Sequence, residues 1–173
     1  MTDSGSERRG RLNWEDTWFE VAAVIAQRSL CVRDQVGAVI VDANNRIVAT
    51  GYNGPPTGFQ HMEQRCTDWC PRAQTTSEIA KLGRPLMPHH LDSLYNDCPS
   101  NHAEANALAV CDRSVRVGGT IYVTSHCCMS CAKLIANSGL KTVSVKPTML
   151  AAHRDPHAVY DFLETCGIDV YVS

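Results

Sequence analysis

The sequence predicts an α/β protein in which helices cover both faces of a five-stranded mixed sheet, giving three layers. Short apolar segments with strand character alternate with segments of helical periodicity along the chain. In the second half, strand and helix alternate strictly, which favours parallel strands joined by right-handed crossovers. With 173 residues, the chain is long enough for one domain with a buried core.

The first elements are expected to be a helix and a hairpin. Residues 1–12 are polar and predict a disordered start. Asn13 is a suitable N-cap, and apolar side chains recur after it at helical spacing, so a helix is predicted over 14–29. Two apolar, β-branched segments separated by turn residues, 36–41 and 46–52, predict an antiparallel hairpin.

A long insertion, residues 53–101, follows the hairpin within a single domain that we expect to cover 13–173. It has little apolar periodicity and is rich in proline and cysteine. A connection of this length inside a compact domain is usually functional or separately braced. The only helix expected in the insertion covers 75–82 and ends before Gly83.

The second half of the chain continues the alternation. Turn and cap residues separate its elements, including Gly139, Gly167 and an Asp-Pro pair that begins the last helix. The expected elements are a helix over 102–110 capped by Ser100 or Asn101, a strand over 120–124, a helix over 128–138, a strand over 141–146, a helix from 155 to 167 and a strand over 168–172.

Composition excludes several classes of protein. The net charge of −2 and the 6% aromatic content do not match a dedicated nucleic-acid binder, which needs a basic surface. No apolar segment approaches the roughly 20 residues that span a bilayer, and the N-terminus lacks the apolar part of a secretory signal. We therefore expect a cytoplasmic protein whose nine cysteines serve metal binding more than disulfides.

One constellation carries the chemistry. His102 and Glu104 open one expected helix, and Cys128 and Cys131 open another. Residues three apart share a helix face, so both thiolates can reach the ion that His102 binds. Three protein ligands leave a fourth position for water, which is typical of a catalytic zinc. A His-x-Glu followed by Cys-x-x-Cys is the pattern of zinc nucleobase deaminases, in which the carboxylate transfers protons.

A closed structural zinc is the alternative, with His126 or Cys127 as a fourth ligand. Cys127 would need a different spacing, and neither residue extends the face formed by Cys128 and Cys131. We therefore assign the catalytic site to His102, Cys128 and Cys131, with Glu104 as the catalytic residue.

These motifs resemble those of the deoxycytidylate (dCMP) deaminases of the cytidine deaminase superfamily. The matching segments are VGAVIV at 36–41, GYNGPP at 51–56 with Gly58, HAEANA at 102–107, IYVT at 121–124 and CMSCAKLIANSG at 128–139. The resemblance implies a cytidine deaminase-like fold and zinc-dependent hydrolysis of dCMP to dUMP and ammonia, which supplies thymidylate synthesis. It also implies a homohexamer.

The resemblance further implies roles for individual residues. Asn53 and Ala103 would contact the substrate, and Asn53 with Gly54 would border a regulatory nucleotide site. There dCTP, accompanied by Mg, would activate and dTTP would inhibit. The candidate residues for binding the 5′-phosphate are the basic residues Arg33, Arg113, Arg116 and Lys133.

One position departs from the family pattern, because Cys127 stands where proline usually precedes the first zinc cysteine. Proline fixes the backbone that enters a helix, so without it the family pattern does not predict the shape of the pocket. One alternative is a deaminase of a modified deoxycytidylate, such as 5-methyl- or 5-hydroxymethyl-dCMP, or of a free nucleoside or base. The other is a deaminase of cytosine in RNA or single-stranded DNA, which the charge and the low aromatic content disfavour.

A second, structural zinc is also predicted. Some members of the family have one that joins the end of the first helix to the insertion, and a metal can brace a long loop with little core. The candidate ligands are Cys66, Cys70 and Cys98, with Cys31 as the fourth and His61 as the alternative.

Overall fold

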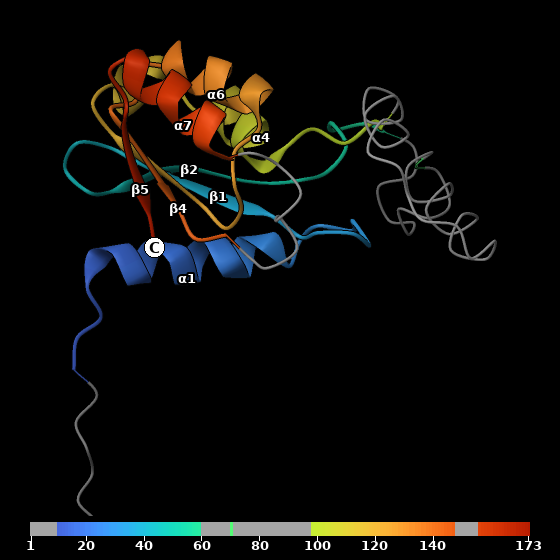
Figure 1. The fold of residues 1–173 in the computed structure, drawn as a ribbon. Helices are drawn as coiled ribbons and strands as arrows, with labels where there is room; N and C mark the ends of the chain where they lie inside the picture. Colours follow the sequence, from blue (N-terminus) through green and yellow to red (C-terminus); the bar gives the residue numbers. More distant parts are fainter. Residues whose placement is uncertain (1–9, 60–69, 71–97, 148–155) are drawn as a thin grey trace, which may run out of the picture.

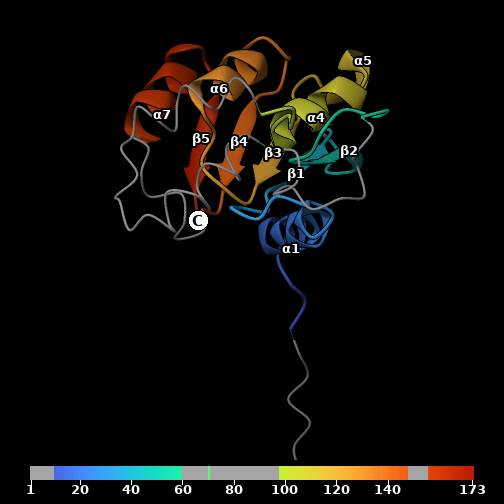
Figure 2. The same ribbon diagram turned by 90° about the vertical axis from the view of Figure 1, so that its right-hand side faces the viewer.

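The computed structural model describes residues 10–59, 70, 98–147 and 156–173. Within them, helices lie on both faces of one sheet (Figures 1 and 2). Helix α1 covers one face, and three shorter helices cover the other. These elements are α1 (Trp14–Ala26), α4 (Ala103–Val110), α6 (Met129–Ala136) and α7 (Pro156–Thr165). The predicted three-layer α/β/α fold is confirmed.

The sheet has five strands in the order β2-β1-β3-β4-β5. Strand β1 (Gly37–Val41) pairs antiparallel with both β2 (Ile47–Tyr52) and β3 (Thr120–Val123). Strand β4 (Thr142–Val145) lies parallel between β3 and β5 (Asp169–Val172). The sheet is therefore mixed, with the hairpin at one edge and the parallel strands at the other, as the order of elements predicts.

Two glycines let a helix approach the sheet closely on each face. A Cβ atom at Gly37 would lie 1.9 Å from the main-chain oxygen of Ala22 in α1. A Cβ atom at Gly51 would lie 2.4 Å from the main-chain oxygen of Ala103 and 2.5 Å from the nitrogen of Ala107, both in α4. Any side chain at Gly51 would therefore push away the helix that begins beside His102.

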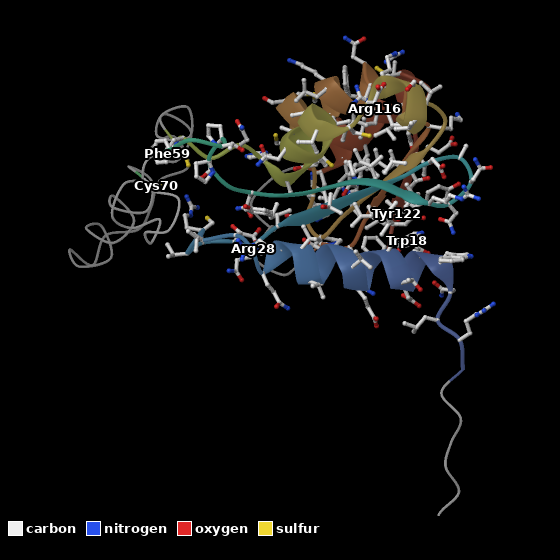
Figure 3. All side chains as sticks on the ribbon, turned by 180° about the vertical axis from the view of Figure 1, so that it is seen from behind. Trp18, Arg28, Phe59, Cys70, Arg116 and Tyr122 are labelled. Carbon is white, nitrogen blue, oxygen red and sulfur yellow. The ribbon has the colours of Figure 1, made fainter. Side chains whose placement is uncertain are left out.

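The core is divided between the two faces. On the α1 side, Trp18 and Ala22 pack against Val39 and Val41 of β1, and Figure 3 shows Trp18 and Tyr122 between α1 and the sheet. The larger cluster lies on the other side, where α4, α6 and α7 cover β1, β3 and β4. Trp14 lies outside the core, because its ring is 62% exposed and only stacks on Trp18.

Several element ends differ from the predictions. Helix α1 is capped by Asn13 as expected but ends at Ala26. Helix α4 begins at Ala103, and its N-cap is His102 in place of the predicted Ser100 or Asn101. A four-residue helix, α5 (Arg113–Arg116), was not predicted, although Asp112 caps it through Ser114. The expected disorder before residue 10, the helix over 75–82 and the Asp155 cap lie outside the described residues.

None of the helices in the described ranges is long and apolar enough to cross a bilayer.

Candidate metal centre

Three side chains predicted to bind zinc lie together. The Nδ1 atom of His102 is 3.4 Å from the sulfur of Cys128 and 3.3 Å from the sulfur of Cys131. All three donor atoms lie within 4.8 Å of one another. Among the described residues, this is the one group of at least three His, Cys, Asp or Glu side chains so arranged.

The local folding explains why the three donors meet. His102 is in extended conformation immediately before α4, and Cys128 is in extended conformation immediately before α6. The main-chain N–H of Cys131 donates to the Cys128 sulfur, which thereby caps α6. Helices α4 and α6 pack side by side on the same face of the sheet, so their first turns converge.

The electrostatics favour a thiolate at this point. The pKa of Cys128 is held well below its usual range, first by a hydrogen bond from Cys131 and then by His102. The hydrogen bond with Cys128, followed by burial, raises the pKa of Cys131, so without a cation Cys128 carries the charge and Cys131 keeps its proton. A bound divalent cation would remove that proton as well.

The donor set fits zinc. In a tetrahedral site with Zn–N near 2.0 Å and Zn–S near 2.3 Å, a nitrogen and a sulfur ligand lie roughly 3.5 Å apart. The two nitrogen–sulfur distances of 3.3 and 3.4 Å are close to that value. His102, Cys128 and Cys131 would hold the ion and leave one position for water.

Glu104 lies beside these ligands and is buried, with 3% of its surface exposed. Burial is the main reason that its pKa is raised, while the charge of His102, its own main-chain N–H and the Cys127 thiol act in the opposite direction. A carboxyl group whose pKa is raised holds a proton more readily, and it can accept and then release one during a reaction. Glu104 is thus suited to transfer protons next to the metal position.

Asn53 holds the loop in front of β1. Its side-chain oxygen accepts from the Val36 N–H at 2.8 Å, and its amide nitrogen donates to the Asp34 carbonyl at 2.9 Å. The next residue, Gly54, exchanges two main-chain hydrogen bonds with Asn101, directly before His102. The Asn53–Gly54 segment is therefore tied to the start of α4. Ala103 lies in the first turn of α4 and is fully buried.

The four candidate phosphate ligands differ in their surroundings. Arg113 donates to the carbonyl of Asn137, and Arg116 donates to three main-chain carbonyls in the helix layer, where Figure 3 shows it. Lys133 is exposed on α6. Of the described residues, only Arg33 has a buried side-chain nitrogen without a hydrogen-bond partner.

Three of the five candidate ligands for a second zinc lie together. Cys70 is buried, and Cys31 and Cys98 pack against it, with 3.4 Å between the sulfurs of Cys70 and Cys98. The other two, Cys66 and His61, lie outside the described residues. The segment after α1 and the insertion therefore meet at these thiols, although the three sulfurs do not all lie within 4.8 Å of one another.

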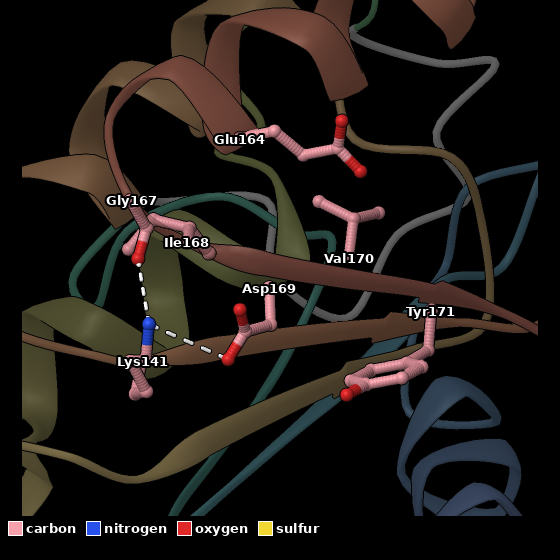
Figure 4. Close-up of a pocket in the computed structure, with 7 residues that line it drawn as sticks. All are labelled: Lys141, Glu164, Gly167, Ile168, Asp169, Val170 and Tyr171. Carbon is pink, nitrogen blue, oxygen red and sulfur yellow. Dashed lines mark hydrogen bonds and ion pairs between the residues drawn. The ribbon is translucent and has the colours of Figure 1, made fainter.

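A depression of about 340 Å³ lies at the far end of the parallel strands (Figure 4). It is lined by the amino end of β5 and by Lys141. The Lys141 ammonium donates to the Gly167 carbonyl and forms an ion pair with Asp169, so its positive charge is already compensated within the protein. The proposed metal ligand Cys128 follows the carboxyl end of β3, at the opposite end of this parallel part of the sheet.

Comparison with known proteins decides the family. The profile of the cytidine and deoxycytidylate deaminase zinc-binding region matches residues 12–146. The chain belongs to the cytidine and deoxycytidylate deaminase family. Members of this family are hydrolytic enzymes with a zinc-binding region, and the matched range includes all three metal-ligand candidates and Glu104.

The relatives support membership of this deaminase family. A deoxycytidylate deaminase of Mycobacterium phage D29 is 39% identical over 133 residues, which cover 77% of this chain and 94% of that protein. The human deoxycytidylate deaminase is 35% identical over 140 residues, covering 81% and 68%. The dCMP deaminase of cyanophage S-TIM5 in apo form superimposes with a TM-score of 0.64 at 25% identity, covering 95% and 100%.

One contact of this deaminase site was not foreseen from the sequence. His126 Nδ1 hydrogen-bonds the hydroxyl of Tyr160 on α7. The sequence contains no signal for it, because it joins residues 34 apart on different elements. Cys127, which stands where the family pattern has proline, is buried beside Cys128, with 1% of its surface exposed.

Proposed function

We propose that the protein catalyses the hydrolytic deamination of dCMP to dUMP and ammonia, which supplies dUMP for thymidylate synthesis. The observation that carries this proposal is the convergence of His102, Cys128 and Cys131 beside the buried carboxyl group of Glu104. The named relatives act on deoxycytidylate, and another structure of the cyanophage enzyme contains dCMP and dUMP. That second structure is 24% identical and supports the fold alone.

The proposed mechanism assigns proton transfer to Glu104. His102, Cys128 and Cys131 would hold a zinc ion, which would supply acidification of the attacking water. Glu104 accepts a proton from that water as its oxygen attacks C4 of the cytosine ring, and delivers this proton to the ring nitrogen. Glu104 then takes the second proton from the new hydroxyl group on C4 and transfers it to the amino group; the bond between C4 and this nitrogen breaks, ammonia leaves and the C4 carbonyl forms. The carboxyl group ends in its starting state, and one water is consumed per ammonia released.

The substrate is tested by measuring ammonia release from dCMP, CMP, deoxycytidine, 5-methyl-dCMP, 5-hydroxymethyl-dCMP and a cytosine-containing oligonucleotide. We expect the highest kcat/KM with dCMP. If kcat/KM is higher for a ring-modified nucleotide, that nucleotide is the substrate and the proposal of dCMP is wrong. Turnover of the oligonucleotide alone would refute the proposal.

For the 5′-phosphate we propose Arg33. Its Nη1 atom is buried and unpartnered within the described residues, whereas Arg113 and Arg116 already bind main-chain carbonyls. Arg33 also adjoins Asp34, whose carbonyl is held by Asn53. Arg33→Met should raise KM for dCMP at least tenfold and leave deoxycytidine kinetics unchanged, with Lys133→Met as the exposed control. An equal effect on both substrates would exclude a phosphate contact.

Asn53 and Ala103 remain our proposed substrate contacts, and Asn53 with Gly54 the border of a regulatory site. Both atoms of the Asn53 amide already hold the loop before β1. A contact with the sugar would therefore use the second hydrogen of its amide nitrogen or the second lone pair of its oxygen. Regulation by dCTP with Mg and by dTTP is tested by steady-state rates with each nucleotide, and rates unaffected by both would refute it.

We also propose a second zinc at Cys31, Cys66, Cys70 and Cys98, with His61 as the alternative ligand. The packing of Cys31 and Cys98 against Cys70 supports it. Metal analysis should give two zinc ions per chain, and one ion in a Cys70→Ser variant. A single ion in the intact protein would exclude this site. The homohexamer, tested by sedimentation, and the cytoplasmic location remain predictions from the resemblance.

A further inference from the structure

Asn106 joins helix α4 to the segment that carries Asn53. Its amide nitrogen donates to the carbonyl of Tyr52 at 2.8 Å and to the carbonyl of Gly54 at 3.3 Å. These two residues flank Asn53, the proposed substrate contact. One side chain of α4 therefore holds the main chain on both sides of the residue that we expect to contact the substrate.

The orientation of the Asn106 amide follows from its neighbours. A main-chain carbonyl only accepts hydrogen bonds, so the amide nitrogen must face Tyr52 and Gly54, and its two hydrogens are enough for both carbonyls. The amide oxygen then faces Asn101, whose side-chain nitrogen donates to it at 3.2 Å. The nitrogen and the oxygen of this side chain thus both have partners, which fixes its rotamer.

Asn106 lies one helical turn after the metal-ligand candidate His102. Its main-chain N–H donates to the His102 carbonyl at 3.0 Å. Side chains on a helix lean toward its amino end, so the amide of Asn106 lies over the turn that presents His102 and Glu104. The segment that carries Asn53 and the groups proposed to act on the substrate are therefore attached to the same turn of α4.

Other hydrogen bonds attach the segment to the loop before β1. The hydroxyl of Ser29, which is buried, donates to the Asn53 carbonyl at 2.7 Å, and the Asn53 N–H donates to the Val36 carbonyl at 3.1 Å. These contacts fix the segment relative to β1. The contacts of Asn106 fix it relative to α4, on which His102 and Glu104 lie.

We propose that Asn106 is a positioning residue for the deamination reaction, whose amide holds the segment so that Asn53 meets the substrate at a fixed place relative to α4. A contact that must first be ordered when the substrate arrives loses part of its binding energy to that ordering. Release of the segment should therefore weaken substrate binding. This inference rests on the proposed function above, in which Asn53 contacts the substrate.

Two substitutions separate the hydrogen bonds of Asn106 from its packing. Asn106→Leu keeps a similar size and favours a helix at least as well, but it has no donor. Asn106→Gln keeps the amide. We expect KM for dCMP to rise about fivefold in the Leu variant, the size of one neutral hydrogen bond, while kcat changes by less than about twofold. KM of the Gln variant should lie nearer to wild type, and zinc content should be unchanged in both. A KM that is unchanged in the Leu variant, or equal in the two variants, would overturn the proposal.

Asn13→Ala is the matched control for a loss of stability. It removes the side-chain cap of α1, which makes two hydrogen bonds with Asp16 on the opposite face of the sheet. It should lower the urea midpoint at least as much as Asn106→Leu and leave KM for dCMP at the wild-type value. If both variants raise KM by the same factor, stability and not the position of the segment accounts for the effect, and the proposal is wrong.

Hydrogen–deuterium exchange tests the contact without turnover. The N–H groups of Asn53 and Gly54 donate to main-chain carbonyls, so they should exchange slowly in the zinc-loaded wild-type protein. Asn106→Leu should speed their exchange about fivefold and leave that of β4 unchanged. If the Leu variant fails to fold, Asn106→Asp takes its place, because it has the same shape but no hydrogen for the two carbonyls. Unchanged exchange of the segment would overturn the proposal.

The two proposals fail in different ways. If wild-type protein releases no ammonia from dCMP, the proposed substrate is wrong. The exchange measurement then still decides whether Asn106 holds the segment. If wild type deaminates dCMP and the Leu variant keeps its KM, only the role of Asn106 is lost.

Discussion

Gly51→Ala should damage catalysis more than its effect on stability explains. The added Cβ atom would lie 2.4 Å from the Ala103 carbonyl oxygen, whereas ordinary contact begins at 3.4 Å. Helix α4 must therefore move away from β2 by about 1 Å, because the neighbouring atoms are main-chain atoms that cannot rotate aside. That movement carries His102 and Glu104 away from Cys128 and Cys131, which sit on a different helix.

The magnitude follows from this displacement. Overpacking of a core costs about 1–3 kcal/mol of stability. A misplacement of about 1 Å can reduce a rate on the order of 100-fold. We therefore expect kcat for dCMP to fall about 100-fold in the folded variant, with weaker zinc binding measured by competition with a chelator.

Gly37→Ala is the matched control. Its Cβ atom would lie 1.9 Å from the Ala22 carbonyl oxygen, so it displaces α1 on the opposite face of the sheet. It should lower the urea midpoint at least as much as Gly51→Ala while leaving zinc affinity and kcat of the folded fraction near wild type. If the two variants lose the same fraction of kcat at equal stability, α4 placement does not control the site.

Three further predictions test other parts of the structure. Glu104→Gln should keep a full complement of zinc, measured by metal analysis, but lose at least about 100-fold in kcat, the usual contribution of a general acid–base group; retained turnover would remove Glu104 from the mechanism. Arg116→Met removes three hydrogen bonds to main-chain carbonyls and should cost about 2 kcal/mol in urea unfolding, whereas Arg113→Met removes one and should cost less. Asp112→Ala should lower Tm more at pH 7 than at pH 3. The Ser114 N–H lowers the pKa of Asp112, so the stabilisation is fully present above the unfolded-state pKa of about 3.9 and declines as pH falls through the folded-state value. An equal loss of Tm at both pH values would contradict this cap.

The order of elements and the convergence of His102, Cys128 and Cys131 could be predicted because they depend on local patterns. Apolar periodicity identified all five strands, and the spacing of Cys128 and Cys131 identified a shared helix face. Helix α5 was missed because four residues are too few to show a period, although Asp112 is a good cap. The N-cap of α4 was missed because His102 makes no side-chain capping hydrogen bond, so no capping residue type identifies it.

Contacts between elements could not be predicted from spacing. Gly51 gives no local sign that α4 lies against it, since a glycine in a strand also marks a bulge or a bend. Trp14 fits the helical pattern of α1, yet it is 62% exposed and stacks on Trp18 at the surface. Both outcomes depend on which residues face them across the fold.

Position 127 shows how the two kinds of information combine. The sequence identifies the position as unusual, since the family pattern has proline there, and proline would fix the backbone before α6. It gives no sign of what holds the loop in its place. In this chain the contact between His126 and Tyr160 ties the loop that leads into Cys128 to helix α7. Tyr160→Phe removes the hydroxyl group of that contact, so the loop is less firmly held and kcat for dCMP should fall. A steady-state kcat equal to that of wild type would show that the tie to α7 does not position the loop.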